Sequence, residues 1–210
     1  MARLLHFLYP NNILSFLCLA LLCLVFLAPI AFVLDGIDSN IFELVIFLFL
    51  FCTFLLITFF AFRSHGVKLF DKTLFKIEIN IKMVLIVIGF QLFINTPLNY
   101  FVGKGEEITF TSLYLFMVVC AAPIIEEFIF RGVFLRALLS KYSANKAIFF
   151  SAVIFALIHI QPMQMLGALA LGLYFGYVFT KTKSFSTVAI LHMIANLVGL
   201  LGKQMLHLVW

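Results

Sequence analysis

The sequence predicts an all-α protein, a polytopic helical bundle that crosses a membrane about seven times. Three observations predict this fold class: the composition, the lengths of the apolar runs and the charges between those runs. Of the 210 residues, 65% are hydrophobic and 11% are charged, and the mean hydropathy is +1.20. A soluble globular domain has about 45–50% apolar and about 25% charged residues, so the composition indicates an integral membrane protein.

The apolar runs are long enough to cross a bilayer, which requires about 20 helical residues. The first run exceeds the signal-peptide core of about 7–15 residues, so it is expected to remain in the protein. The fourth is long enough to be tilted or to protrude. The sixth carries Ala168, Gly172 and Gly176 at every fourth position, a pattern that permits close helix packing. The predicted spans are 12–34, 41–62, 82–103, 109–139, 144–161, 163–180 and 184–202.

The charges between the runs predict the orientation. Basic residues concentrate in every second connection, and the positive-inside rule assigns those connections to the cytoplasm. The N-terminus is then cytoplasmic and the C-terminus external. This distribution accounts for the net charge of +5, so no nucleic-acid partner is expected. The cytoplasmic side holds Arg3, Arg63, Lys68, Lys72, Lys76, Lys82, Arg136, Lys141, Lys146, Lys181 and Lys183, and the external side holds Asp35, Asp38, Lys104, Glu106, Glu107 and Lys203.

The chain is expected to form a single integral membrane domain with two parts. Residues 1–107 hold the N-terminal helices and a basic cytoplasmic segment, 63–82. That segment is either an amphipathic helix on the membrane surface or an ordinary connection tucked under the bundle. Residues 108–203 form the second part. The cysteines lie in apolar runs without zinc or disulfide spacing and are expected to be buried hydrophobes: Cys18, Cys23, Cys52 and Cys120.

Charged residues at membrane depth mark the fourth run, at Glu126, Glu127 and Arg131. Each such charge costs roughly +2.5 to +3.5 kcal/mol on insertion scales, so these residues should face the bundle interior. Adjacent helical residues point about 100° apart, so the two glutamates are not expected to form a dyad. Glu127 and Arg131 have the favourable i, i+4 ion-pair spacing and receive a supporting role. Glu126 has no such local partner and is expected to be the carboxylate that takes part in the reaction.

Two more polar sites interrupt apolar runs. His159 follows Phe155 by four residues, and Asn196 follows His192 by the same spacing. Alone, these residues would be packing histidines and helix–helix contacts. At 1.5 Å per residue, however, Glu126 and these three polar residues lie about 12–22 Å from the cytoplasmic face. We therefore expect one polar cavity, with its mouth nearer the cytoplasmic side.

The motifs Glu126-Glu127-x-x-x-Arg131, Phe155-x-x-x-His159 and His192-x-x-x-Asn196, in this order, resemble those of the CAAX protease and bacteriocin-processing family, also called the Abi family. The resemblance covers roughly residues 110–203, and the short chain is most like the small bacterial members. It implies that residues 108–203 are the catalytic core and that the protein lies in the inner membrane of a bacterial cell. It implies a glutamate-dependent intramembrane endopeptidase with no cofactor. It also implies a membrane-associated peptide or protein substrate, with peptide processing or bacteriocin self-immunity as the biological role.

The residue chemistry agrees with hydrolysis. Glu126 and His159 are suited to hold and deprotonate a water molecule that attacks a peptide carbonyl. His192 and the amide of Asn196 are suited to donate hydrogen bonds to the developing oxyanion.

Two alternatives use the same residues. Glu126, His159 and His192 would bind zinc in a metalloprotease, although no His-Glu-x-x-His spacing is present and the family is usually described as metal-independent. A non-catalytic immunity protein or a transporter would use the buried groups as a binding site or a proton relay. Asn196 favours hydrolysis, because an amide donor suits an oxyanion and adds nothing to proton transfer. The sequence carries no signal for the oligomeric state.

Overall fold

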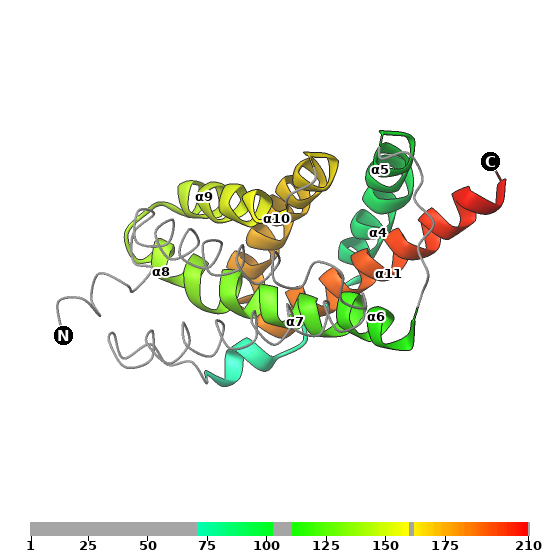
Figure 1. Ribbon diagram of the computed structural model, residues 1–210. Helices are drawn as coiled ribbons and strands as arrows, with labels where there is room; N and C mark the ends of the chain where they lie inside the picture. The colour runs from blue at the N-terminus through cyan, green and yellow to red at the C-terminus, as the bar shows by residue number, and fades with distance from the viewer. Residues whose placement is uncertain (1–70, 103–110, 160–161, 210) are drawn as a thin grey trace, which may run out of the picture.

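The computed structural model describes residues 71–102, 111–159 and 162–209, and every regular element in these ranges is a helix (Figure 1). The finding confirms a helical membrane bundle. Four helices in this part of the chain are long and apolar enough to cross a membrane: Ile81–Tyr100, Ser112–Leu139, Pro162–Thr182 and Phe185–Leu206.

The predicted count of seven spans is not confirmed. The first two predicted spans, 12–34 and 41–62, lie outside the described residues. The fifth, 144–161, is a shorter apolar helix, α9 (Ala144–Leu157). Its 14 residues rise about 21 Å, less than the hydrocarbon core of about 30 Å. Length alone therefore does not make α9 a full span.

The third predicted span contains a π-helical turn at its centre. Its segments are α4 (Ile81–Phe90), η2 (Gln91–Asn95) and α5 (Thr96–Val102). The side chain of Asn80 caps the start by accepting a hydrogen bond from the backbone N–H of Met83 at 3.0 Å. Leu92 and Phe93 are exposed on one side, as expected for a lipid-facing surface, whereas Gln91 is buried.

The fourth predicted span is a helix of 28 residues, longer than a membrane crossing requires. Thr111 caps it by accepting a hydrogen bond from the backbone N–H of Tyr114 at 3.1 Å. Glu126 and Glu127 end its central α segment, which lies between two π-helical segments of a kind frequent at functional sites. The segments are α6 (Ser112–Phe116), η3 (Met117–Ala121), α7 (Ala122–Glu127), η4 (Phe128–Leu135) and α8 (Arg136–Leu139).

Helix α9 packs closely against α10 (Pro162–Thr182), and small residues allow it. A Cβ atom at Gly172 would lie 3.2 Å from the Cα of Ala152, and one at Gly176 would lie 2.9 Å from the Cγ2 of Ile148. The close packing predicted from the small residues is confirmed at these two glycines. Their partner is the preceding helix, which runs antiparallel to α10.

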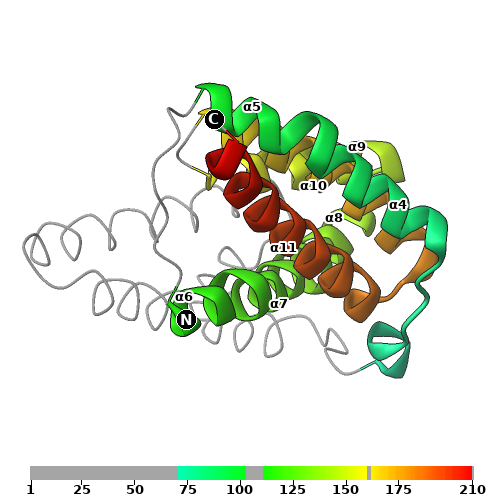
Figure 2. The same cartoon turned by 90° about the vertical axis from the view of Figure 1, so that its right-hand side faces the viewer.

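Helix α11 (Phe185–Val209) lies between the other long helices (Figure 2). It follows α10 after a tight turn, in which Lys183 adopts a φ of 54° and donates its backbone N–H to the carbonyl of Phe179 at 2.8 Å. It runs parallel to α4–α5. Gln91 Nε2 donates to the Ala195 carbonyl at 2.7 Å, and further along both helices Gly202 lies beside Thr96.

The described part of the basic segment is a connection rather than an amphipathic helix. It contains a four-residue 3₁₀ helix, η1 (Lys72–Phe75), in which Leu74 is buried. The Ser184 hydroxyl donates to the Lys76 carbonyl and holds the segment against the start of α11. Residues 63–70 lie outside the described part.

Candidate active site

A buried ion pair lies at the centre of the bundle. Arg131 Nη1 donates to Glu127 Oε1 at 2.8 Å, and neither side chain has any exposed area. Arg131 Nη2 also donates to the Gly172 carbonyl at 3.1 Å, and its guanidinium lies 4.7 Å from the centre of the Phe155 ring. The ion pair predicted from the i, i+4 spacing is present, and α10 supplies its additional acceptor.

Glu127 has a second partner that the local sequence pattern did not reveal. The same oxygen, Oε1, lies 2.9 Å from His192 Nδ1 on α11, 65 positions along the chain. With Nδ1–H donating to the carboxylate, the imidazole ring is fixed in orientation and Nε2 faces away from Glu127. That Nε2 lies 3.8 Å from Glu126 Oε2. His192 therefore lies between the two glutamates.

Glu126 differs from its neighbour in exposure. Its side chain is 28% exposed, against 0% for Glu127. The 3.8 Å separation from His192 exceeds a hydrogen bond, although contacts of this kind are often long before a substrate binds. Of the two adjacent carboxylates, Glu126 is the one that water can reach.

A cavity of about 330 Å³ brings the predicted residues together. Its lining includes Glu126 on α7, His159 just after α9, and His192 and Asn196 on α11. The sequence had placed these four side chains in one layer by counting residues along separate spans. The structure places them around one cavity.

His159 lies at the end of α9, just beyond the last helical residue. Its Nδ1 is 2.9 Å from the Phe155 carbonyl, and its ring packs edge-on against the Phe155 ring with centroids 5.0 Å apart. When Nδ1–H donates to this carbonyl, Nε2 is left as an acceptor. No direct contact with Glu126 is present among the described residues, so joint binding of a water molecule by these two residues stays a prediction.

Asn196 is held by a distortion of the facing helix. Its Nδ2 donates to the Val118 carbonyl at 2.8 Å, and Val118 lies in the π-helical segment η3. A primary amide has two N–H groups, so one remains for another acceptor.

Residues 108–198 match the family described as Rce1-like, type II CAAX prenyl endopeptidase. This segment, 91 of the 210 residues, is similar to that family and is here called the Rce1-like domain. The match contains all three motifs and confirms the resemblance to the CAAX protease and bacteriocin-processing family. No curated protein and no solved structure matches the chain.

The family match supports an intramembrane protease in general, and with the four apolar helices it indicates an integral membrane protein.

Polar residues outside the Rce1-like domain also line the cavity, and the sequence motifs had not revealed them. Gln91, Asn95 and Asn99 come from the third predicted span. Their four-residue spacing on an otherwise apolar helix was the available signal. Lys203, beyond the other end of the domain, also contributes to the lining.

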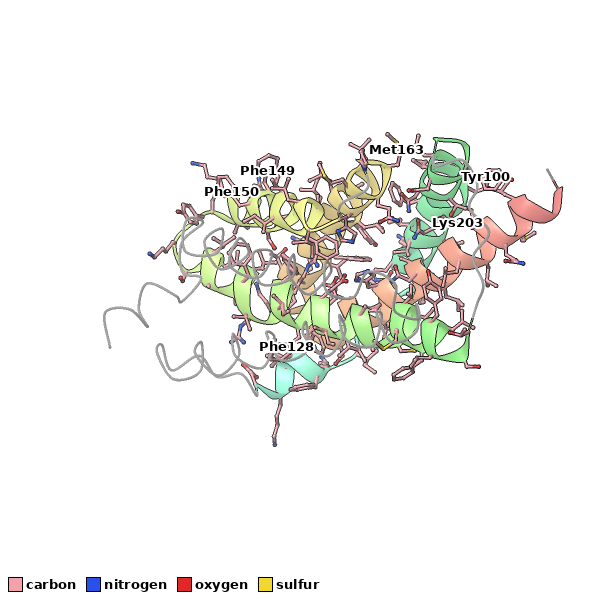
Figure 3. All side chains as sticks on the ribbon, in the orientation of Figure 1. Tyr100, Phe128, Phe149, Phe150, Met163 and Lys203 are labelled. Atoms are coloured by element: carbon pink, nitrogen blue, oxygen red, sulfur yellow. The ribbon has the colours of Figure 1, made fainter. Side chains whose placement is uncertain are left out.

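The cavity extends from Glu126 and His192 toward one end of the bundle, here called the cavity end, lined by Asn99, Tyr114, Gln164 and Lys203. Figure 3 shows Lys203, Tyr100 and Met163 toward this end, away from Phe149 and Phe150. The opposite end, here called the basic end, carries Lys72, Lys76, Lys82, Arg136, Lys141, Lys146, Lys181 and Lys183.

The predicted mouth on the cytoplasmic, basic side is not supported by the described residues, because the lining extends from Glu126 away from that end. Buried apolar side chains such as Phe134, Leu138 and Phe179 fill the bundle between the cavity and the basic end. Counting residues gave the depth of the site but carried no information about which end is filled.

Within 71–102, 111–159 and 162–209, no three side chains of His, Cys, Asp or Glu lie together as metal ligands. The zinc alternative thus gains no ligand set in this part of the chain, and independence from metal stays a prediction.

Proposed function

We propose that the protein is an intramembrane endopeptidase in which Glu126 activates the attacking water. The observation that supports this most is the shared cavity, whose lining contains one partly exposed carboxylate together with His159, His192 and Asn196. Burial in an apolar bundle strengthens the electrostatic interactions of these groups. The Rce1-like family match supports the same reaction class.

In the proposed reaction, a water molecule in the cavity gives a proton to Glu126 as its oxygen attacks the peptide carbonyl carbon. Nε2 of His159 accepts a hydrogen bond from that water and positions it. The tetrahedral intermediate collapses when the carbon–nitrogen bond breaks. The leaving amine takes the proton from Glu126, so one peptide bond and one water yield a carboxylic acid and an amine.

His192 and Asn196 are proposed to stabilise the oxyanion. Asn196 has an N–H beyond the one donated to Val118. In the proposed state His192 carries a proton on each ring nitrogen, so that Nδ1–H donates to Glu127 and Nε2–H, beside Glu126, donates to the oxyanion. A single oxyanion donor contributes about 2.7–4 kcal/mol to the lowering of the barrier. Glu127 is a positioning residue, because its carboxylate holds His192 through Nδ1 at 2.9 Å.

Glu126→Gln tests the proposal, since the amide keeps the side-chain volume and cannot take the proton. The purified protein in lipid nanodiscs is incubated with a mixed peptide library, and new termini are identified by mass spectrometry. The wild type should generate new termini and the variant should not. Glu78→Gln is the matched control, because Glu78 pairs with the exposed Lys76 at the basic end.

Full activity of Glu126→Gln would refute the proposed base. No cleavage by the wild type, with import or binding of peptides intact, would favour a transporter or a non-catalytic immunity protein.

For the biological role, we propose processing of a peptide substrate linked to bacteriocin production or self-immunity. Peptides released by wild-type cells but not by Glu126→Ala cells identify that substrate.

A further inference from the structure

A row of side-chain amides that the proposed mechanism does not use lines part of the cavity. Asn99 Nδ2 donates to Asn95 Oδ1 at 3.0 Å, and Asn95 Nδ2 donates to Gln91 Oε1 at 2.6 Å. Gln91 Nε2 in turn donates to the Ala195 carbonyl at 2.7 Å. These three residues, here called the amide ladder, form one hydrogen-bonded chain that leads from the cavity end to α11.

Glycines on the neighbouring helices make room for the amide ladder. A Cβ at Gly167 on α10 would lie 2.0 Å from Asn95 Oδ1, and one at Gly199 on α11 would lie 3.2 Å from Gln91 Nε2. Any other residue at Gly167 would displace the Asn95 amide. The ladder is thus held in a fixed position between two helices.

The ladder retains hydrogen-bonding groups for a ligand. A primary amide offers two N–H donors and two lone pairs. Asn95 donates one N–H within the ladder, and the Oδ1 of Asn99 accepts no hydrogen bond from the described residues. Both side chains are half-buried and line the cavity, whereas Leu92 and Phe93 on the same helix are exposed. A donor and an acceptor therefore remain on the cavity side.

The spacing of the amide ladder matches an extended peptide. Asn95 and Asn99 are four residues apart where the helix continues as α5, which is about 6.0 Å along the axis at the α-helical rise. An extended chain presents N–H and C=O groups to the same side every second residue, about 6.6–6.8 Å apart. Adjacent amides can therefore meet consecutive main-chain groups on one edge of a strand.

We propose that the amide ladder is a main-chain subsite that binds a substrate peptide in extended form. This inference rests on the proposed function and adds to it the conformation that the substrate adopts. Recognition through the main chain would leave side-chain specificity to other parts of the cavity. Asn95 and Asn99 make the direct contacts, and Gln91 anchors them to the Ala195 carbonyl.

The test measures binding without cleavage, in a Glu126→Gln background. The probe is a mixed library of ten-residue peptides with a photo-reactive leucine at the centre, added to the protein in nanodiscs. A second library has N-methyl groups on alternate main-chain amides. Each hydrogen bond contributes about 0.5–1.5 kcal/mol, so N-methylation and Asn99→Leu should each reduce cross-linking to residues 91–99 about two- to tenfold.

Asn145→Leu is the matched control, because Asn145 is exposed at the start of α9, at the basic end. It should cross-link like the parent protein, and all variants should show the same thermal midpoint within a few degrees. Equal cross-linking of both libraries, equal cross-linking by Asn99→Leu, or cross-links that avoid residues 91–99 would overturn the subsite. Cross-linking that follows the prediction while the wild type cleaves nothing would refute only the proposed function.

A second inference rests on a different observation, the charges at the two ends of the bundle. The basic end carries the eight Lys and Arg residues named above, with Asp71 and Glu78. The cavity end carries Lys203 as its basic residue within the described ranges. By the positive-inside rule, the basic end faces the cytoplasm.

The geometry therefore points to a cavity that opens on the non-cytoplasmic side of the membrane. A substrate in aqueous solution would then reach the cavity from that side. The reaction that supplies a peptide made in the cell must be its translocation across the membrane, and cleavage must follow export.

Cysteine accessibility tests this orientation. In a background without the four natural cysteines, Asn99→Cys and Lys203→Cys report the cavity end, and Lys141→Cys is the matched reporter of the basic end. An impermeant maleimide should label the first two in intact cells, and should label Lys141→Cys only in inside-out vesicles. The reverse pattern, or equal labelling of the two ends from one side, would overturn the inference.

Discussion

At the residue scale, Glu127 has two partners, and both would be affected by its loss. Oε1 accepts from Arg131 at 2.8 Å and lies 2.9 Å from His192 Nδ1, while Oε2 has no partner among the described residues. Replacing a carboxylate in such a position strongly destabilises the folded protein, because its removal leaves buried donors without acceptors.

Arg131→Ala should strongly destabilise the protein, because it leaves the fully buried carboxylate of Glu127 without its cation. Removing one partner of a buried pair costs about 3–5 kcal/mol. Glu127→Gln combined with Arg131→Ala should recover part of this loss. A double-mutant cycle of thermal midpoints in detergent measures the coupling, and strictly additive effects would contradict the assignment.

The sequence predicted Glu126, Glu127, Arg131, His159, His192 and Asn196 as a set, and each of the six lies beside at least one partner in the structure. Local spacing was sufficient for the pair of Glu127 and Arg131, because both lie on one helix. It could not give the contact of His192 with Glu127, which depends on how α11 packs against α7.

At the scale of the element, the glycines of the helices differ in what surrounds them. A Cβ at Gly172 would meet backbone and side-chain atoms of Ala152 at 3.2 Å, whereas one at Gly89 would meet nothing within 4 Å. The backbone of α9 cannot move without shifting the whole helix. The Gly172 carbonyl also accepts from Arg131, so a shift there would reach the buried ion pair.

Gly172→Ala should therefore lower the thermal midpoint, with an overpacking cost of about 1–3 kcal/mol. Gly89→Ala is the matched control. It should raise stability by about 0.8–1.0 kcal/mol at most, because alanine has the higher helix propensity. Thermal denaturation of both variants in the same detergent checks the pair. A similar decrease of the thermal midpoint in both variants would show that α9 does not crowd Gly172.

The sequence predicted the elements unevenly, for physical reasons. Apolar runs identified the helices near 82–103, 109–139, 163–180 and 184–202, because hydropathy reports directly on burial in lipid. Hydropathy overestimated the length of the fifth span, since α9 ends at Leu157, before His159. The π-helical segments η2, η3 and η4 left no pattern in the sequence. The contact of Asn196 with the Val118 carbonyl in η3 was equally out of reach, because it joins residues 78 positions apart.

At the scale of the whole molecule, the proposed reaction uses only groups of the chain itself and water. Prolonged treatment with EDTA or phenanthroline should leave peptide cleavage unchanged, and elemental analysis should find less than one zinc per chain. Loss of activity on chelation, with recovery on adding zinc, would instead support a metalloprotease with Glu126, His159 and His192 as ligands.

The short helix α9 has a consequence for the surrounding membrane. Its rise of about 21 Å is less than the hydrocarbon thickness of about 30 Å, so the lipid beside it must thin or His159 must lie below the level of the headgroups. This hydrophobic mismatch should make turnover depend on acyl-chain length. Cleavage in bilayers of shorter-chain phosphatidylcholines should exceed that in longer-chain ones at equal fluidity, with Glu126→Gln as the blank. The bilayer would then act as a regulator, favouring the enzyme wherever a membrane is thin.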